Sequence, residues 1–306
     1  MKVMVFDVGG TEIKYSVMDE QMNRFDAGSV PTPQDTQEHF LDTIYALYAP
    51  HKDEVDGIAM ALPGFVDANT GYVSNGGALL YNTGTQVGQL VRERCGCRVT
   101  LENDGKAAAI AELRAGALQG CCNAAVFIIG TGVGGGIIAN GQLVRGVHFT
   151  AGEYSFVNTN AEAWDAPDQN MACQCSTSNL LKWYRARKAL PEDAPLDGRS
   201  FFAAANAGEP EALEVLRRFC HAVAVQIYNL TVLLDVEKVA IGGGISKQPL
   251  LLENLRSAYD GLYASRAGQA YMEGLPRCQI VPCAFSSEAN QVGVAAAYFE
   301  AMQKKC

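Results

Sequence analysis

The stretch that decides the fold is VMVFDVGGT, residues 3–11. Its first four residues are apolar and mostly β-branched or aromatic, which predicts one buried strand ending near Asp7. The two glycines allow a tight turn whose backbone can come close to a ligand, and the threonine adds a hydroxyl. The N–H groups of such a turn can point at an anion. The stretch therefore predicts a phosphate-binding turn, with an ordinary β-hairpin turn as the alternative, since residues 13–17 alternate as a second strand.

The carboxylate of Asp7 predicts a metal ion beside this turn. A carboxylate among phosphate-binding groups would repel the phosphate unless a divalent cation lay between them. Mg²⁺ prefers oxygen ligands and is commonly shared between carboxylates and substrate phosphates. We therefore expect a nucleotide bound with Mg²⁺, and Asp7 on the metal side.

Length and charge limit the classes of function. A chain of 306 residues, 48% apolar, suggests two domains with ample cores. The formal charge of −9, without a basic cluster, argues against nucleic acid as the main partner. No apolar run approaches the ~20 residues that a membrane span needs. The first residues show no leader-like segment, so we expect a cytoplasmic protein whose ten cysteines are reduced thiols.

The plan of the N-terminus recurs later in the chain. Residues 124–129 are a buried strand, residues 130–136 read GTGVGGG, and a strand resumes at 137–139. Two such units predict two similarly built α/β domains that face each other across a cleft. Residues 150–180 lose the periodicity and read as loops. The remaining expected strands are 12–18, 24–30, 57–62, 98–101 and 239–241, and the expected helices are 36–48, 86–94, 106–115, 177–187, 208–234 and 287–303.

Asp104 is the candidate general base. It follows an expected strand and precedes an expected helix, a place where a carboxylate can face a ligand. Asn103 beside it can donate and accept hydrogen bonds. The alternative is that the pair only caps the helix that begins near Lys106.

An ordered set of motifs carries a resemblance to a known family. The set is DxGGT at 7–11, PGxVD at 63–67, END at 102–104, GTGxGGG at 130–136, AGE at 151–153 and GGG at 242–244. It resembles the ROK family of sugar kinases, within the actin/hexokinase/Hsp70 superfamily. The resemblance implies a ribonuclease-H-like fold in each domain, ATP and a hexose in the cleft, and a homodimer. The small domain would be residues 1–115 plus 287–306, and the large domain residues 116–286.

The resemblance also assigns roles to residues. Asp104 would take the proton from the sugar hydroxyl, and Gly64, Asn103 and Glu153 would line the sugar side. The nucleotide and its phosphates would be bound by Asp7, Gly9, Gly10, Thr11, Lys14, Gly130, Thr131, Gly132, Gly134, Gly243 and Gly244. Taken alone, the second glycine run, residues 130–136, could be a hairpin, and the third, residues 242–244, could be an ordinary turn after a strand.

The zinc motif of the family is degenerate here. Family members typically continue G-E-x-G-H and then C-x-C-G-x-x-G-C-x-E, in which the histidine and three cysteines bind a structural zinc. This chain reads GEYSF at 152–156, with Phe156 in the histidine position, and Leu180 in that of the third cysteine. Cys173 and Cys175 remain, but two thiols do not supply the four ligands of a tetrahedral site. We therefore expect ATP and Mg²⁺ but no structural zinc.

The identity of the sugar stays open at this stage. The histidine and the final glutamate of the motif are sugar contacts in typical glucokinases of the family, and their absence here leaves the identity of the sugar open. The expected substrate is glucose or a related hexose. N-acetylmannosamine and β-glucosides are alternatives. A non-catalytic sugar-sensing protein of the family is a further one. Regulators of that type carry a helix-turn-helix region first, for which the position of Asp7 leaves no room.

Overall fold

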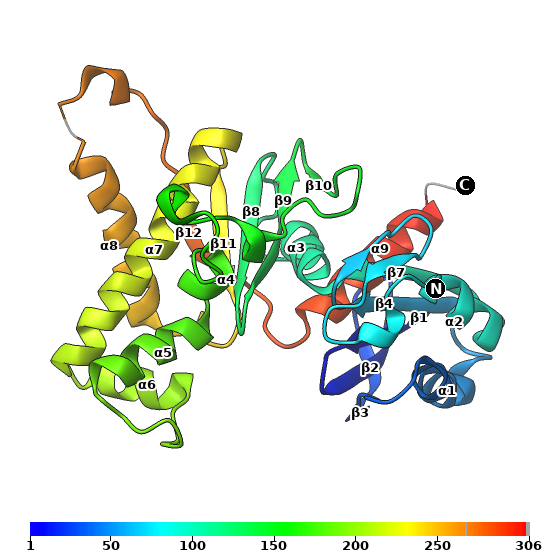
Figure 1. Ribbon diagram of the computed structural model, residues 1–306. Helices are drawn as coiled ribbons and strands as arrows, with labels where there is room; N and C mark the ends of the chain where they lie inside the picture. The colour runs from blue at the N-terminus through cyan, green and yellow to red at the C-terminus, as the bar shows by residue number, and fades with distance from the viewer. Residues whose placement is uncertain (267, 304–306) are drawn as a thin grey trace. The chain divides into compact units, whose positions relative to one another are not determined.

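The computed structural model describes residues 1–266 and 268–303 (Figure 1). Their contacts group the chain into two compact units. Unit 1 holds Met1–Ala115, Leu143–Ala151 and the segment that starts at Ser287. Unit 2 holds Gly116–Gln142 and Gly152–Ser286. Each unit is built on a five-stranded sheet, and the predicted α/β class is confirmed.

The first three strands of the unit 1 sheet were predicted from the sequence, and they pair as an antiparallel meander. The strands of this sheet are β1 (Lys2–Val8), β2 (Glu12–Asp19), β3 (Arg24–Pro31), β4 (Gly57–Leu62) and β7 (Arg98–Asn103). Their order is β3-β2-β1-β4-β7, and β4 runs parallel to both β1 and β7. All six residues of β4 are buried, as a central strand covered on both faces requires. The carboxyl ends of three adjacent parallel strands therefore share one edge.

Helices cover both faces of this sheet. They are α1 (Gln37–Tyr48), α2 (Val87–Cys95), α3 (Asp104–Ala115) and α9 (Ala289–Gln303), with the short elements η1 (Ala49–His51), η2 (Leu80–Asn82), β5 (Phe65–Val66) and β6 (Val73–Asn75). Thr36 caps α1, because its hydroxyl accepts a hydrogen bond from the N–H of His39 at 3.2 Å. Helices α3 and α9 pack on each other so closely that a Cβ at Gly293 would lie 1.8 Å from the carbonyl oxygen of Ala107.

The second five-stranded sheet, which lies mainly in unit 2, repeats the same strand order. It runs β10-β9-β8-β11-β12, with β8 and β9 antiparallel and β11 parallel to both β8 and β12. The strands are β8 (Ala124–Ile129), β9 (Val133–Ala139), β10 (Gln142–Val144), β11 (Lys238–Gly242) and β12 (Gln279–Pro282). The prediction of two similarly built domains rested on the repeated strand, glycine turn and strand in the sequence, which correspond to β1–β2 and β8–β9.

The helices of unit 2 enclose its core. They are α4 (Met171–Gln174), α5 (Thr177–Arg187), α6 (Gly198–Asn206), α7 (Pro210–Leu234) and α8 (Pro249–Ala264), with the short turns η3 (Tyr154–Phe156), η4 (Ala161–Ala163) and η5 (Ala270–Met272). Apolar side chains from the sheet and from these helices form one cluster that includes Phe127, Phe201 and Phe219. Strands β5, β6, β10 and β12 and helices α4, α6 and α8 were not predicted from the sequence.

One strand boundary also differs from expectation. The sequence predicts that a strand resumes at 137, but β9 begins at Val133 and includes the glycines before it. The reason is the close approach of β8: Gly135 has φ +141°, and a Cβ there would lie 1.8 Å from the carbonyl oxygen of Val126. Only glycine adopts this pairing, so the glycines belong to the strand as well as to the turn.

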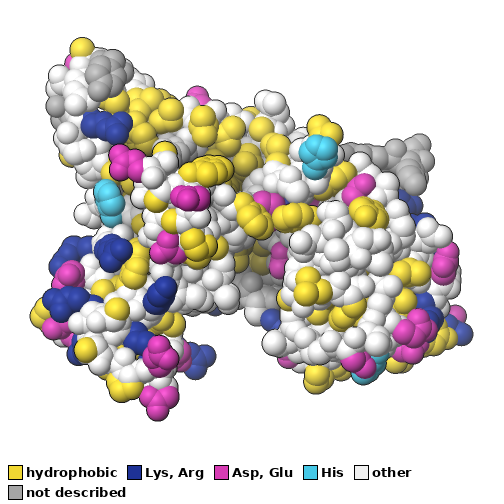
Figure 2. Space-filling model, viewed as in Figure 1, with side chains coloured by type: hydrophobic (Ala, Val, Ile, Leu, Met, Phe, Trp, Pro, Cys, Tyr) yellow, Lys and Arg dark blue, Asp and Glu magenta, His cyan; other side chains and the backbone are white. Residues whose placement is uncertain are grey.

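The thiols and the charged surface that the structure describes are those of residues 1–266 and 268–303. The nine cysteines within them form no disulfide bond. No helix in the same residues is long and apolar enough to cross a membrane. On the face shown in Figure 2, acidic and basic side chains are interspersed. Several basic groups of unit 2 are ion-paired, among them Arg187 with Glu214 and Lys188 with Glu209.

Candidate functional site

The predicted residues of unit 1 gather where three parallel strands end. Asp7 lies near the end of β1, Gly64 follows β4, and Asp104 follows β7. The strand register aligns Asp7 with Ala61 and Ala61 with Glu102, so the three strand ends stand side by side. The carboxyl edge of a sheet is where α/β proteins commonly bind ligands. This edge is the candidate site of unit 1.

The first glycine turn is a hairpin turn and still offers donors to an anion. The N–H of Gly9 donates to the carbonyl of Glu12 at 2.9 Å and closes the hairpin. Thr32 and Gln34 donate from their side chains to the carbonyls of Gly9 and Gly10. Among residues 1–266 and 268–303, no group accepts a hydrogen bond from the N–H of Gly10 or of Thr11. The two interpretations of this stretch are therefore compatible, because the hairpin leaves two N–H groups for a phosphate.

The environment of Asp7 suits a cation. Burial raises the pKa of Asp7 above its ordinary value, and a hydrogen bond from Asn290 together with the charge of Lys14 opposes that rise. Asn290 Nδ2 lies 2.8 Å from Asp7 Oδ1, and Lys14 is the residue opposite Asp7 in the β1–β2 ladder. A buried carboxylate with one bonded oxygen would be stabilised further by a divalent ion, so the chemistry of the donor set fits Mg²⁺.

Asn103, and not Asp104, caps α3. Asn103 Oδ1 accepts from the N–H of Lys106 at 3.0 Å, the usual geometry of a capping side chain. Its amide nitrogen donates both to the carbonyl of Gly64 at 2.9 Å and to Asp104 Oδ1 at 3.0 Å. Asp104 Oδ1 also accepts from the N–H of Gly105 at 2.7 Å. The cap is thus supplied without the carboxylate of Asp104, whose orientation is fixed through one oxygen.

The same contacts restrict Asn103 as a sugar ligand. Both of its amide hydrogens are engaged, so a sugar hydroxyl could bond only to the remaining lone pair of Oδ1. Its contact with sugar stays a prediction. What the structure adds is that Asn103 joins the loop after β4 to Asp104.

The loop after β4 is fixed by its backbone. Gly64 has φ +88°, and a Cβ there would lie 2.0 Å from the carbonyl oxygen of Asn75, so no other residue fits without a shift. Asp67, in the same motif, accepts hydrogen bonds from the N–H groups of Asn69 and Thr70 and from the Thr70 hydroxyl. Its carboxylate therefore shapes the turn.

A buried ion pair next to Asp104 was missed by the sequence reasoning. Arg145 donates from Nε and Nη2 to Glu102 Oε2 at 3.0 and 2.7 Å, and the Glu102 side chain is only 2% exposed. The other oxygen of Glu102 accepts from the N–H of Asn103 at 3.1 Å. A buried carboxylate needs such partners. Glu102 is part of the END motif, but nothing in the sequence identifies Arg145 as its partner.

The second glycine turn, in unit 2, offers donors in the same way. The N–H of Gly130 donates to the carbonyl of Gly132, and the N–H of Thr177 donates to the carbonyl of Gly130 at 2.9 Å. The N–H groups of Thr131 and Gly132 have no acceptor in the part of the chain that the structure describes. Each sheet thus carries a hairpin turn of Gly and Thr with two available donors.

The segment around Glu153 is fastened to β9. Tyr154 is 3% exposed, donates from its hydroxyl to the carbonyl of Gly136 at 3.1 Å, and packs its ring on Phe127. Ser155 forms hydrogen bonds with Val133, directly after the glycine turn. Glu153 is half-buried between these anchors and Gly152. Ser155 is a residue of this region that the sequence reasoning did not assign.

The third glycine run lies at the end of β11. Gly243 has φ +96°, and a Cβ there would lie 2.1 Å from the carbonyl oxygen of Ile129 at the end of β8. Ser246 donates to the carbonyl of Gly243 at 2.8 Å and fixes the turn. A Cβ at Gly244 would meet nothing within 4 Å. The ends of β8 and β11 therefore bring Gly130 and the third run to the same edge of the second sheet.

The remnant of the zinc motif does not form a zinc-binding set. Leu180 is fully buried in the apolar core, and Phe156 is 70% exposed. Burial raises the pKa of the Cys175 thiol to about 12, which opposes the thiolate that zinc requires. The thiol of Cys173 lies 3.7 Å from the carbonyl oxygen of Pro167. These donors do not fit a tetrahedral zinc ion.

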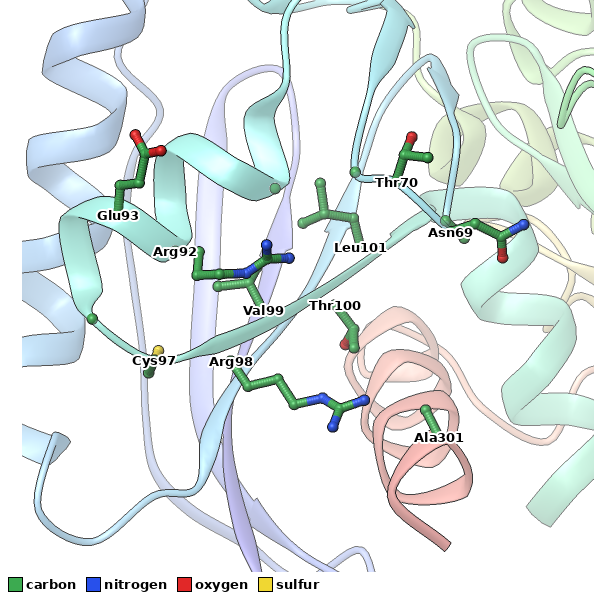
Figure 3. A pocket seen from close by; sticks show the side chains of 14 residues that line it. Asn69, Thr70, Arg92, Glu93, Cys97, Arg98, Val99, Thr100, Leu101 and Ala301 are labelled. Carbon is green, nitrogen blue, oxygen red and sulfur yellow. The ribbon is translucent and has the colours of Figure 1, made fainter. Parts of the chain in front are cut away.

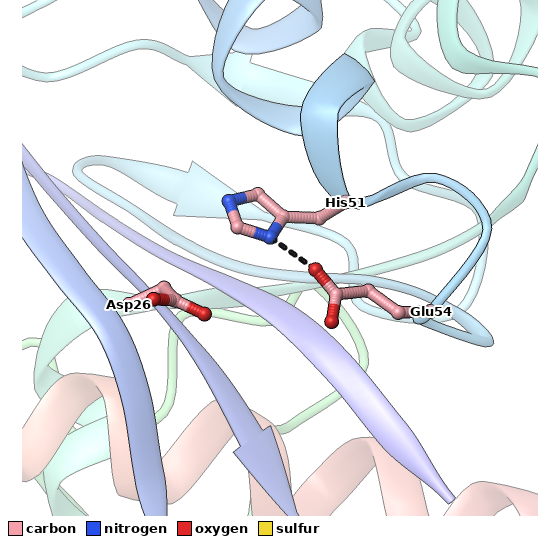
Figure 4. A group of neighbouring side chains, drawn as sticks. All are labelled: Asp26, His51 and Glu54. Atoms are coloured by element: carbon pink, nitrogen blue, oxygen red, sulfur yellow. Dashed lines mark hydrogen bonds and ion pairs between the residues drawn. The ribbon is translucent and has the colours of Figure 1, made fainter.

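Two further features of unit 1 contain none of the predicted site residues. One is a pocket of about 970 Å³ along β7, lined in part by Arg92 and Arg98 (Figure 3). The other is a group of Asp26, His51 and Glu54, in which His51 Nδ1 lies 2.6 Å from Glu54 Oε1 (Figure 4). Neither feature is part of the candidate site.

Comparison with known proteins assigns the family. Residues 3–303 match the family model described as ROK family. The chain belongs to the ROK family. A beta-glucoside kinase of Klebsiella pneumoniae is 30% identical over 259 residues, which is 84% of this chain and 86% of that protein. Other relatives in the ROK family carry the names N-acetyl-D-glucosamine kinase and glucokinase.

Solved ROK structures resemble the whole chain. A ROK family protein from Streptococcus pneumoniae TIGR4 in complex with sucrose has a TM-score of 0.86 at 28% identity, covering 99% of this chain and 100% of that one. A ROK family glucokinase from Streptomyces griseus in complex with glucose and AMPPNP has a TM-score of 0.79 at 26% identity, covering 97% and 99%. The predicted family, its fold and its activity class, sugar kinase, are confirmed.

Proposed function

We propose that the protein transfers the γ-phosphoryl group of ATP to a hydroxyl of glucose or a related hexose, with Asp104 as the general base. The observation that carries this proposal is the shared strand edge of unit 1. Asp7, the Gly10–Thr11 turn and Asp104 all lie where parallel strands end. A phosphate-binding turn and a positioned carboxylate on one edge are the parts that phosphoryl transfer to an alcohol requires.

The remaining predicted residues take supporting roles in this proposal. The turns at 9–11 and 130–134 would bind the phosphates through their N–H groups, and Lys14 would add a positive charge. Gly243 and Gly244 would lie against the adenosine. Gly64, Asn103 and Glu153 would line the sugar side. Mg²⁺ near Asp7 would neutralise charge on the phosphates.

Asp104 is suited to accept the proton of the sugar hydroxyl. It is the first residue of α3, and a helix N-terminus is a favourable place for a negative carboxylate. Two donors to Oδ1, from Asn103 and Gly105, fix the orientation of the carboxylate. Positioning and proton removal are the protein's main tasks, because the transfer itself needs little covalent help.

We also propose the remaining features that the sequence predicts. Residues 1–115 with 287–306 would form a small domain and residues 116–286 a large one. The protein would be a cytoplasmic homodimer that binds neither nucleic acid nor membranes. Size-exclusion chromatography with light scattering tests the homodimer.

An ADP-release assay tests the function. With ATP alone we expect little turnover, and with glucose, N-acetylmannosamine or a β-glucoside such as cellobiose we expect turnover with at least one sugar. A β-glucoside is the second candidate, since the Klebsiella relative is named for that substrate. ATP binding without turnover of any sugar in a broad panel would favour a non-catalytic sugar-sensing protein.

Metal dependence gives a separate expectation. Activity should be lost on chelation with EDTA and return with Mg²⁺, because Asp7 would otherwise repel the phosphates. The purified protein should hold well under one zinc per chain, since Leu180 is buried in the core and burial keeps Cys175 protonated. Elemental analysis measures this, and stoichiometric zinc would contradict the ligand argument.

A further inference from the structure

The hydroxyl of Ser155 holds the end of the second glycine turn through two hydrogen bonds. Ser155 Oγ accepts from the N–H of Val133 at 3.0 Å and donates to the carbonyl of the same residue at 3.2 Å. Val133 is the first residue of β9, directly after Gly130–Gly132, and its side chain is 2% exposed. A single side chain therefore fixes both backbone groups where the turn joins the strand.

Glu153 lies between contacts that attach its segment to the same strand. On one side, a Cβ at Gly152 would lie 3.2 Å from the Cα of Gly136. On the other side, the hydroxyl of Tyr154 donates to the carbonyl of Gly136. Ser155 follows and binds Val133. The backbone around Glu153 thus has a fixed register against β9.

The hydroxyl of Ser155 also lies next to the glycine turn itself. A Cβ at Gly132 would lie 2.9 Å from Ser155 Oγ. A displacement of Ser155 would disturb its two hydrogen bonds to Val133 at the end of the turn. Because packed contacts of this kind transmit small shifts, the segment of Glu153 and the turn should move together.

We propose that Ser155 is a positioning residue that fixes the Gly130–Gly134 turn relative to Glu153, so that sugar held by Glu153 raises the affinity of the turn for nucleotide phosphate. This rests on the proposed function, in which Glu153 contacts sugar and the turn binds phosphate. The family motif quoted above has glycine at this position, and glycine has no hydroxyl to form either bond. The two hydrogen bonds between Ser155 and Val133 therefore depend on a residue that departs from the family motif.

The chain offers a matched control for a purely structural role. Ser200 Oγ likewise accepts from the N–H of one residue, Asp197, at 3.0 Å and donates to its carbonyl at 2.9 Å. Ser200 lies in the capping box of α6 and in neither glycine turn. Ser200→Ala removes the same pair of bonds and should leave nucleotide binding unchanged.

The test measures AMPPNP affinity by calorimetry with and without saturating glucose or cellobiose, in the presence of Mg²⁺. In the wild type and in Ser200→Ala, the sugar should tighten AMPPNP. In Ser155→Ala we expect this coupling to fall about tenfold, the effect of losing about 1.4 kcal/mol of hydrogen bonding. Ser155→Thr keeps the hydroxyl and should keep most of the coupling. Reciprocity requires that AMPPNP tighten the sugar by the same factor.

Amide hydrogen exchange separates this proposal from the proposed function. In the ligand-free protein, Ser155→Ala should exchange faster than the wild type in peptides covering 130–136, and Ser200→Ala should not. Failure of every sugar to bind or react would refute the proposed function, and the exchange result would still decide the link between Ser155 and the turn. Unchanged exchange at 130–136, or a coupling in Ser155→Ala equal to that of the wild type, would overturn the inference.

Discussion

Asp104→Asn is expected to lower kcat by at least ~10²-fold while the fold and the sugar affinity change little. A positioned general base typically contributes ~10²–10⁴-fold in rate, and an amide cannot take the proton of a sugar hydroxyl. The amide oxygen of Asn can still accept the hydrogen bonds that Asn103 and Gly105 now give to Asp104 Oδ1. Steady-state kinetics with the best sugar measures kcat, and calorimetry measures sugar affinity.

Asp197→Asn is the matched control for this variant. Asp197 is a true helix cap, because its carboxylate accepts from the N–H of Ser200 at 2.8 Å at the start of α6. Asn and Asp rank about equally as caps, so Asp197→Asn should keep near wild-type kcat and stability. An Asp104→Asn enzyme as active as this control would show that Asp104 has no catalytic role.

Arg145→Ala is expected to destabilise the protein by about 3 kcal/mol, because it leaves the carboxylate of Glu102 buried without its cation. The Glu102 side chain is 2% exposed, and both nitrogens that Arg145 offers bind the same oxygen. Arg145 itself is 35% exposed, which keeps the expected loss at the lower end for a buried pair. Denaturant unfolding measures the change. Activity should also fall, since Glu102 bonds to the N–H of Asn103 beside the proposed base.

Two further variants separate the cost of leaving the Glu102 carboxylate without its cation from the cost of losing an ordinary ion pair. Arg187→Ala removes an exposed pair with Glu214, whose side chains are 48% and 56% exposed, and should cost about 0.5 kcal/mol or less. In the double variant Glu102→Gln/Arg145→Ala, the buried group is neutral, so part of the lost stability should return. If Arg145→Ala cost no more than Arg187→Ala, the buried pair would contribute little to folding.

Strands and turns that depend on local sequence could be predicted, because burial and backbone conformation restrict which residues can occupy them. Strand β4 reads as a continuous apolar run because both of its faces are buried. The glycine runs predicted turns because their backbone angles and contacts require glycine, as at Gly64 and Gly243. Several short strands and three helices were missed. Helix α8 had a readable signal, since Leu251, Leu255, Tyr259 and Tyr263 recur every four residues and are all buried.

Contacts between distant segments could not be predicted from one sequence. The Glu102–Arg145 and Ser155–Val133 bonds join residues 43 and 22 positions apart. Each depends on the path of an irregular loop, and no spacing rule connects the partners. The sequence likewise could not show that Asn103, rather than Asp104, caps α3. Either residue could cap α3 by type, and only the backbone geometry at the strand end decides between them.

The place of α9 in unit 1 has a consequence for synthesis on the ribosome. Helix α9 packs on α3 and contacts β1 and β4, and its Tyr298 donates to the carbonyl of Asp56. These partners are translated long before α9, with all of unit 2 between them in the chain. A nascent chain therefore exposes the apolar surface that α9 later covers until translation is nearly complete. Such surface binds chaperones and promotes aggregation, so truncation before Ser287 should yield insoluble protein.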